Sequence, residues 1–387
     1  MIRLLVFACL ALAAVPGTTS AQEVPELQIN SKRYIVIDAA TGDIYAQKGA
    51  DDRVAIASLT KVFTAVQALE MAPLDMLITT DESDLFGSDA TVMGFGPGET
   101  YTLNDLLFGM MLPSGNDAAH AVARTLGARP GDTPEQSVDR FVSWMNQRNA
   151  DMGLTNTHLK NPTGWGVEGH YSSARDVATF MSYALKYPEL VEAMGTISYT
   201  TSNGITLTNT NKLLRSYDLL EGGKTGYDDD AGYCLIEFAQ RGNNTMISVT
   251  LDGLVPDDWY DDNRVLLNYA LDQKETLAAS NQPFAGQVTS WRDPAAAEIA
   301  RAAQVAGSFA TGNTFVPAVK PEDDAPGIAS IPDAVPEVAG KSTSLARQVA
   351  GKGPWIAVGV VLVLVLLRGV WTFRRYPDQD SGALTSD

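Results

Sequence analysis

The chain has 387 residues, 45% of them hydrophobic, and 28 Lys and Arg stand against 46 Asp and Glu, a formal net charge of -18. This length leaves room for one large domain with appendages. The negative balance excludes nucleic acid as a partner, because contacts to phosphates need clustered lysine and arginine side chains.

The N-terminus predicts an export signal. One positive charge is followed by an apolar run, and the small residues at 19–21 offer a cleavage point before Gln22. We therefore interpret residues 1–21 as a signal peptide. Its removal leaves Cys234 as the single thiol, so no internal disulfide is expected.

Residues 22–275 alternate strand and helix patterns and are predicted to form the main domain. A hairpin is expected at 33–46. Helical patterns begin at Ser58, Leu103, Ala118, Pro134 and Ala174, a last helix is expected at 259–271, and strand patterns lie at 197–201, 205–208, around Lys224, at 233–238 and at 246–250. Strands at both ends predict an α/β (α+β) fold: an antiparallel sheet flanked by helices, plus an all-helical region, with a cleft between them.

The character of the sequence changes after the last predicted helix. Residues 276–353 are rich in Pro, Ala and Asp and have few large apolar side chains, apart from one short helical pattern at 293–301. Such a composition cannot bury enough apolar surface to fold, so an unstructured tether is expected.

The C-terminus predicts a membrane anchor. Residues 354–376 form an apolar stretch with a basic flank, long enough for a transmembrane helix. Three arginines lie on its C-terminal side, so residues 377–387 are expected in the cytoplasm and the domain outside. An amphipathic surface anchor is the competing interpretation, which the absence of a polar face at 356–367 disfavours. The sequence thus predicts a single-pass protein of the cytoplasmic membrane in the cell envelope.

Three short strings occur in one order: Ser58-Leu59-Thr60-Lys61, Ser114-Gly115-Asn116 and Lys224-Thr225-Gly226. Residues three apart share one face of a helix, so Ser58 and Lys61 can come within hydrogen-bond reach. Burial and the second cation, Lys224, would lower the pKa of the Lys61 amine and let it accept the serine proton. Each string alone has an ordinary interpretation: an exposed helix face, a loop with Asn116 as N-cap, and an edge strand. Together they favour a serine acyltransferase with a lysine base.

Longer blocks around the second and third strings, at 95–119, 161–176 and 223–235, extend the pattern. With these blocks the chain resembles the serine-type D-alanyl-D-alanine carboxypeptidases, low-molecular-mass penicillin-binding proteins of peptidase family S11 that are related to β-lactamases. The resemblance covers roughly residues 29–271. It implies a β-lactamase/transpeptidase-like fold, peptidoglycan stem peptides as substrates, covalent inhibition by β-lactam antibiotics and no cofactor or metal.

The resemblance and the chemistry together suggest roles for the catalytic residues. Ser58 is expected to attack the carbonyl of the penultimate D-alanine, and Lys61 to accept its proton. Ser114 is expected to pass a proton to the leaving amine. The activity implied is that of a D-Ala-D-Ala carboxypeptidase acting through an acyl-enzyme.

Five further residues are expected to bind the substrate. Asn116 would hydrogen-bond the substrate amide or the Lys61 ammonium. Lys224 and Thr225 would meet the terminal carboxylate. Gly226 would let the substrate approach the strand closely, and the backbone N–H of Tyr227 would complete an oxyanion hole with that of Ser58.

The chain departs from the family pattern in two places. Asp228-Asp229-Asp230 follow Tyr227 where relatives commonly carry threonine, and the loop at 253–262 lacks an arginine that some relatives have. An acidic rim disfavours an anionic substrate. Turnover and substrate preference are therefore left open by the sequence.

Two alternatives keep the same serine: a D,D-endopeptidase acting on cross-linked peptidoglycan, and a penicillin-binding receptor that is acylated without turnover. A β-lactamase is disfavoured, because the surroundings of Glu168 do not match a deacylating glutamate. The three histidines, His120, His158 and His170, are scattered and show no metal-ligand spacing.

Overall fold

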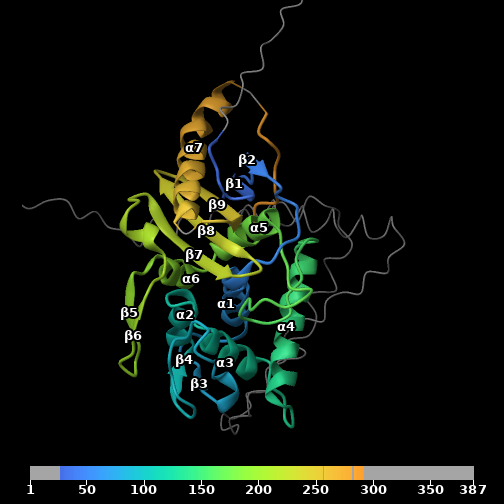
Figure 1. Ribbon diagram of the computed structural model, residues 1–387, viewed down its shortest axis with the longest axis vertical. Coiled ribbons are helices and arrows are strands. Elements are labelled where there is room, and N and C mark those ends of the chain that lie inside the picture. The colour runs from blue at the N-terminus through green and yellow to red at the C-terminus, as the bar shows by residue number, and fades with distance from the viewer. Residues whose placement is uncertain (1–26, 256, 281–282, 292–387) are drawn as a thin grey trace, which may run out of the picture. The chain divides into compact units, whose positions relative to one another are not determined.

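The computed structural model describes residues 27–255, 257–280 and 283–291. A five-stranded antiparallel sheet in the order β2-β1-β9-β8-β7 lies at its centre (Figure 1). Its strands are β1 (Arg33–Asp38), β2 (Ile44–Lys48), β7 (Leu220–Asp228), β8 (Gly232–Arg241) and β9 (Asn244–Gly253). Because β1 pairs with β9, the first and last strands close the same sheet, and β7 is left at one edge.

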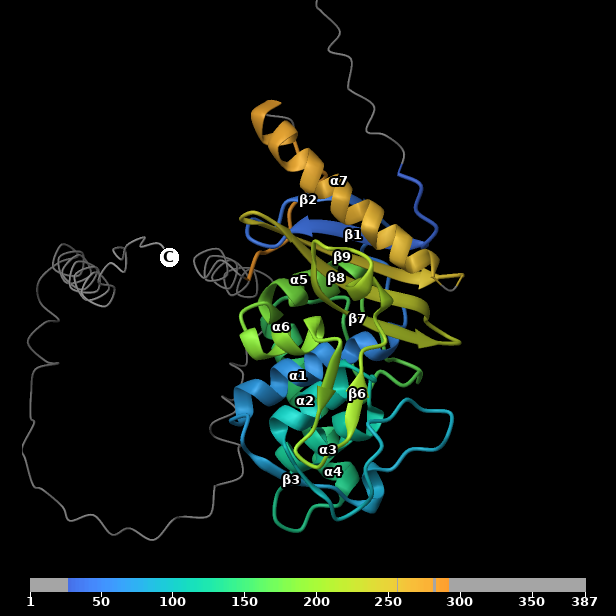
Figure 2. The same cartoon turned by 90° about the vertical axis from the view of Figure 1, so that its left-hand side faces the viewer.

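Helices cover both faces of this sheet, as Figure 2 shows: α7 (Asp258–Ser280) lies over one face, and the other helices lie on the opposite side. Side chains alternate between the faces along each strand. Val36 and Met246 accordingly pack against Leu266 of α7, whereas Ile35 and Ile247 face the larger core on the other side.

The helical part is built around α1, whose first nine residues, from Thr60 to Ala68, are all buried. Its helices are α1 (Thr60–Met71), α2 (Leu103–Met111), α3 (Asn116–Leu126), α4 (Pro134–Asp151), α5 (Ala174–Ala184) and α6 (Pro188–Gly195). Side-chain caps mark the starts of α2, α4 and α5. In α4 a capping box joins Thr133 and Gln136, and Pro134 occupies the first turn.

Short elements connect these parts. Two-stranded sheets are formed by β3 (Leu77–Thr79) with β4 (Thr100–Thr102) and by β5 (Ser198–Thr200) with β6 (Thr206–Thr208). The 3-10 turns are η1 (Ala57–Leu59), η2 (Glu82–Asp84) and η3 (Lys212–Arg215). Of these, η1 and η3 border the site described below.

The predicted antiparallel sheet with flanking helices is confirmed, and so is the edge strand around Lys224. Three local predictions need correction. Ser58 lies in the 3-10 turn η1 and not in α1, which begins only at Thr60; Ala57, at the start of this turn, has a positive φ that an α-helix does not allow. The helix expected from Ala118 begins at Asn116, so its N-cap is Gly115 and Asn116 is its first residue. The last helix is longer than predicted and ends at Ser280.

The boundary that the sequence suggested at residue 275 falls inside α7. Beyond it, residues 283–291 return to the domain, where Ile44 N donates to Gly286 O at 3.0 Å and Trp291 is 1% exposed. No helix in the described part of the chain is long and apolar enough to cross a membrane. The predicted signal peptide, most of the tether, the C-terminal anchor at 354–376 and the tail at 377–387 lie outside the described residues.

Candidate active site

Ser58 is presented by a tight turn at the start of α1. The residue before it, Ala57, has a φ of 45°, a conformation that residues with a side chain rarely adopt. Gly164, with a φ of 87°, packs against this turn, and a Cβ there would lie 1.9 Å from the Ala57 carbonyl oxygen. The turn that carries Ser58 is therefore held from behind by a glycine with no room for a side chain.

Lys61 lies next to Ser58 and is fully buried. Its Nζ is 2.8 Å from Ser58 Oγ and donates to the Thr163 carbonyl oxygen, also at 2.8 Å. Burial, and after it the nearby charge of Lys224, holds the pKa of Lys61 well below its usual range, because a charged amine loses its hydration there. An amine with a lowered pKa can be neutral near pH 7 and accept a proton.

Ser114 and Lys224 form a second pair beside the first. Ser114 lies between α2 and α3 with a φ of 62°, and its carbonyl oxygen accepts from Thr91 Oγ1 at 2.8 Å. Lys224 Nζ donates to Ser114 Oγ at 2.9 Å and to the Thr225 carbonyl oxygen at 2.7 Å. Burial lowers the pKa of Lys224 to about 7. Two amines with lowered pKa values thus each contact one serine hydroxyl.

Strand β7 forms the wall opposite these serines. A Cβ at Gly226 would lie 3.0 Å from Ser58 N and 3.1 Å from Ile56 O, so a glycine lets β7 pass close to the turn of Ser58. The neighbouring Thr225 places its Oγ1 2.7 Å from Thr210 Oγ1. Backbone and hydroxyl donors of β7 are therefore brought next to the nucleophile.

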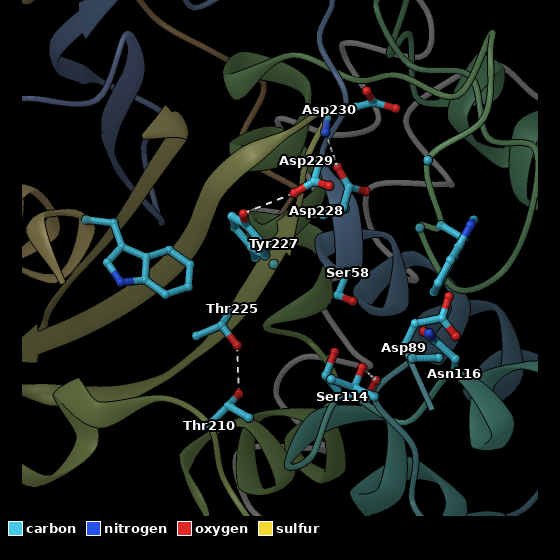
Figure 3. A pocket seen from close by; sticks show the side chains of 18 residues that line it. Ser58, Asp89, Ser114, Asn116, Thr210, Thr225, Tyr227, Asp228, Asp229 and Asp230 are labelled. Carbon is cyan, nitrogen blue, oxygen red and sulfur yellow. Dashed lines mark hydrogen bonds between the residues drawn. The ribbon is translucent and has the colours of Figure 1, made fainter. Parts of the chain in front are cut away.

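These residues open into one pocket of about 690 Å³, a volume that suits a small ligand. Six of the eight predicted site residues line it: Ser58, Ser114, Asn116, Thr225, Gly226 and Tyr227. The other two, Lys61 and Lys224, are buried behind the serines. In Figure 3 Ser58 lies in the middle, with Thr225 and Thr210 on one side of it and Asn116 and Asp89 on the other.

An acidic rim borders the pocket, as the sequence predicted for the turn after Tyr227. Asp228, Asp229 and Asp230 all line it, together with Asp89 (Figure 3). Burial, and then the charges of its two neighbours, raises the pKa of Asp228. The segment at 253–262 contributes only Trp259, in the first turn of α7, to the lining and none of its aspartates.

Some contacts of the site were missed by sequence reasoning. Thr210 and Thr163 are single threonines in irregular segments, and only the tertiary fold brings them to Thr225 and Lys61. Asp117 accepts from the backbone N–H groups of Met93 and Gly94 at 2.8 and 2.9 Å, and so anchors a loop that borders Ser114. The 161–176 block was the one signal that could have pointed to Thr163.

The histidines and Glu168 lie elsewhere. His120 Nδ1 is 2.8 Å from Asp84 Oδ1, and His170 Nε2 is 2.8 Å from Thr60 Oγ1 in a buried place that lowers the pKa of His170 to about 4. Glu168 is exposed and does not line the pocket. In the described part of the chain no group of three or more His, Cys, Asp or Glu side chains could hold a metal ion.

The chain is similar to known proteins in sequence and in fold. The chain is 33% identical over 294 residues to the D-alanyl-D-alanine carboxypeptidase DacF of Bacillus subtilis, covering 73% of this chain and 72% of that one. It is 33% identical over 237 residues to DacA of Escherichia coli, covering 58% of this chain and 57% of that relative. The solved structure of the Streptomyces K15 DD-transpeptidase matches with a TM-score of 0.60 and 32% identity, over 63% of this chain and 98% of that one.

The family assignment rests on the length of the match. The profile of peptidase family S11, described as D-alanyl-D-alanine carboxypeptidase, matches residues 18–254. That segment holds the turn of Ser58, the loop of Ser114 and strand β7. The chain therefore belongs to the D-alanyl-D-alanine carboxypeptidases of peptidase family S11, with their penicillin-binding-protein fold.

Proposed function

We propose that the chain is a serine D-alanyl-D-alanine carboxypeptidase that removes the terminal D-alanine from peptidoglycan stem pentapeptides through an acyl-enzyme on Ser58. One observation carries the proposal: a buried amine with a lowered pKa, that of Lys61, lies 2.8 Å from Ser58 Oγ. A hydroxyl beside a neutral amine is a nucleophile with its base in place. The names of the relatives in the same family support this activity.

Acylation follows from these contacts. Ser58 Oγ attacks the carbonyl carbon of the penultimate D-alanine while its proton moves to Lys61 Nζ. In this proposal the oxyanion that forms is stabilised by the backbone N–H groups of Ser58 and Tyr227. The support is the close passage of β7 beside Ser58 N at Gly226, the residue before Tyr227. The peptide bond then breaks, and the carbonyl stays on Ser58 as an ester.

The leaving amine of the terminal D-alanine needs a proton. Ser114 Oγ supplies it and is replenished by the protonated amines, since Lys224 Nζ lies 2.9 Å away. Free D-alanine leaves, and a water molecule takes its place. Lys61 accepts a proton from this water, the hydroxyl attacks the ester, and Ser58 regains its hydrogen as the shortened peptide departs.

Recognition of the terminal carboxylate makes the proposed enzyme select substrates with a free C-terminus. The carboxylate is placed against the Thr225 hydroxyl, a donor for an anion, with the buried amine of Lys224 behind the wall of the pocket. Asn116, on the opposite side of Ser58 in Figure 3, binds the peptide amide of the acyl part. A β-lactam carries a carboxylate and a reactive carbonyl in the same relation and acylates Ser58 as a covalent inhibitor.

The test is release of free D-alanine from a stem pentapeptide by a protein comprising residues 22–291. Ser58→Ala should abolish this release and the covalent labelling by penicillin, and Lys61→Ala should nearly abolish both with the fold retained. Penicillin labelling that persists in Ser58→Ala would refute the nucleophile. Cleavage of cross-linked peptides without D-alanine release would favour a D,D-endopeptidase, and labelling without either product a receptor.

For its location, we infer a single-pass protein of the cytoplasmic membrane with the domain on the outer side. The supports are the export signal at 1–21 and the apolar stretch at 354–376 with its C-terminal arginines. Truncation before Pro354 should release a soluble, active enzyme from cells. Extraction of the full-length protein by carbonate alone would contradict a membrane-spanning helix.

A further inference from the structure

Glu237 is a buried carboxyl group that the proposed reaction does not use. It lies in β8 with 0% exposure, and its Oε2 accepts a single hydrogen bond, from Asn211 Nδ2 at 3.0 Å. Its Oε1 is buried with no partner among the described residues. The equally buried Asp84 differs, because Arg124 and His120 both contact it. Burial raises the pKa of Glu237 well above its usual range, which favours the uncharged form of the acid.

The carboxyl group of Glu237 occupies a notch in the strand that carries Lys224. Glu237 pairs with Gly223 across β8 and β7. A Cβ on Gly223 would lie 1.7 Å from Glu237 Oε2 and 2.5 Å from the Ile236 carbonyl oxygen. The absence of a side chain at Gly223 therefore leaves room for the carboxyl group of Glu237. Gly223 is also the residue directly before Lys224 of the site.

Asn211 connects the carboxyl group of Glu237 to the pocket. While its Nδ2 donates to Glu237, its Oδ1 accepts from Leu213 N at 3.0 Å and caps η3. Asn211 is 0% exposed. The residue before it is Thr210, whose N–H donates to Leu112 O at 3.1 Å and whose Oγ1 lies 2.7 Å from Thr225 Oγ1. The segment that presents Thr210 is thus fixed to strand β8 by the contact with Glu237.

The hydrogen-bond direction between the two threonines matters for the substrate. A hydroxyl has one proton to donate. If Thr210 donates to Thr225 Oγ1, the Thr225 proton is left to point into the pocket, where the proposed function places the substrate carboxylate. A displaced Thr210 would free Thr225 to turn its proton elsewhere.

We infer that Glu237 is a positioning residue for carboxylate recognition, acting through Asn211 and Thr210 on the Thr225 hydroxyl. It touches neither the substrate nor the reacting atoms. The inference rests on the proposed function, in which Thr225 meets the terminal carboxylate.

The test compares two acyl donors on the purified full-length protein. One is a diacylated L-Lys-D-Ala-D-Ala tripeptide, and the other is a thioester of the same acyl group whose leaving group has no carboxylate. Glu237→Met keeps the length of the side chain and removes its acceptor. It should lower kcat/KM for the tripeptide roughly tenfold, mainly through KM, the size of one charge-assisted hydrogen bond, and leave the thioester unchanged. Glu237→Gln, which keeps the acceptor, should behave as wild type on both.

Equal losses on both donors, or no loss on the tripeptide, would overturn the inference and make Glu237 a packing residue. Asn211→Ser keeps a capping side chain and loses the contact to Glu237, so it should give the same defect and serves if Glu237→Met does not fold. Wild type that is acylated by the thioester but releases no D-alanine would refute the proposed function instead. The rate of acylation by benzylpenicillin, which carries a carboxylate, would then report on Glu237.

Discussion

Lys61→Met tests whether the amine beside Ser58 is uncharged in the folded protein. Methionine has a similar length and does not titrate. In the folded chain burial holds the pKa of Lys61 well below its usual range, whereas in the unfolded chain the amine is solvated and protonated up to about pH 10. With a neutral amine in the folded protein, unfolding between about pH 8 and pH 9 takes up a proton at this position, so this group contributes stability that increases as the pH rises.

The size of the effect follows from one proton. A difference of one bound proton changes the free energy of unfolding by about 1.4 kcal/mol per pH unit. Lys224, whose pKa burial lowers to about 7, adds a second slope of the same sign to wild type and variant alike. The variant lacks the slope of Lys61. Its stability relative to wild type should consequently rise by about 1.4 kcal/mol as the pH is lowered from about 9 to about 8.

Urea denaturation at the two pH values, at constant ionic strength, measures both free energies. The matched control is Lys48→Met, which removes an exposed lysine at the end of β2 and should leave the difference from wild type independent of pH. Equal pH slopes for wild type and Lys61→Met would show that Lys61 is protonated in the folded protein and refute its role as base. Penicillin acylation by the variant should fall by about 10²- to 10⁴-fold.

Three further substitutions test the surroundings of the site. Gly164→Ala, whose Cβ would lie 1.9 Å from Ala57 O, should lower the stability by about 2 kcal/mol or more in thermal unfolding and slow penicillin acylation; unchanged acylation would contradict its part in holding the turn. Gly223→Ala should destabilise the wild type by more than it destabilises Glu237→Ala, because truncating Glu237 removes one of the two close contacts and leaves that with the Ile236 carbonyl oxygen; additive effects in the double variant would show that Gly223 does not make room for the Glu237 carboxyl group. Changing the aspartates of 228–230 to asparagine should raise kcat/KM for an anionic peptide, with the gain vanishing at about 1 M salt; a gain that persists there is not electrostatic.

Local chemistry made much of the site predictable from the sequence. The three-residue spacing of Ser58 and Lys61 holds in the structure, although η1 and not a helix carries the serine. A continuous apolar run at 233–236 identified β8, because both faces of this strand meet a core. The long helix α7 was recognised but was predicted too short.

What the sequence concealed depends on contacts between distant segments. Thr210 reaches Thr225 through contacts of its segment with distant parts of the chain, among them Leu112 and Tyr260. One threonine in a polar stretch gives no periodic signal. Glu237 reads as an interruption of an apolar strand. Its fit to Gly223 appears only when β7 and β8 are in register.

The positive φ angles of Ala57 and Ser114, 45° and 62°, have a consequence for how this domain would respond to selection. Each costs of order 1 kcal/mol of folding free energy, and glycine or asparagine would relax it. A library of variants selected for heat tolerance alone would therefore accumulate glycine or asparagine at both positions. At position 57 this change would loosen the turn of Ser58, and at position 114 it would remove Ser114. The melting temperature would rise while the catalytic activity was lost. Selection for stability in this enzyme therefore has to include a measurement of turnover in every round.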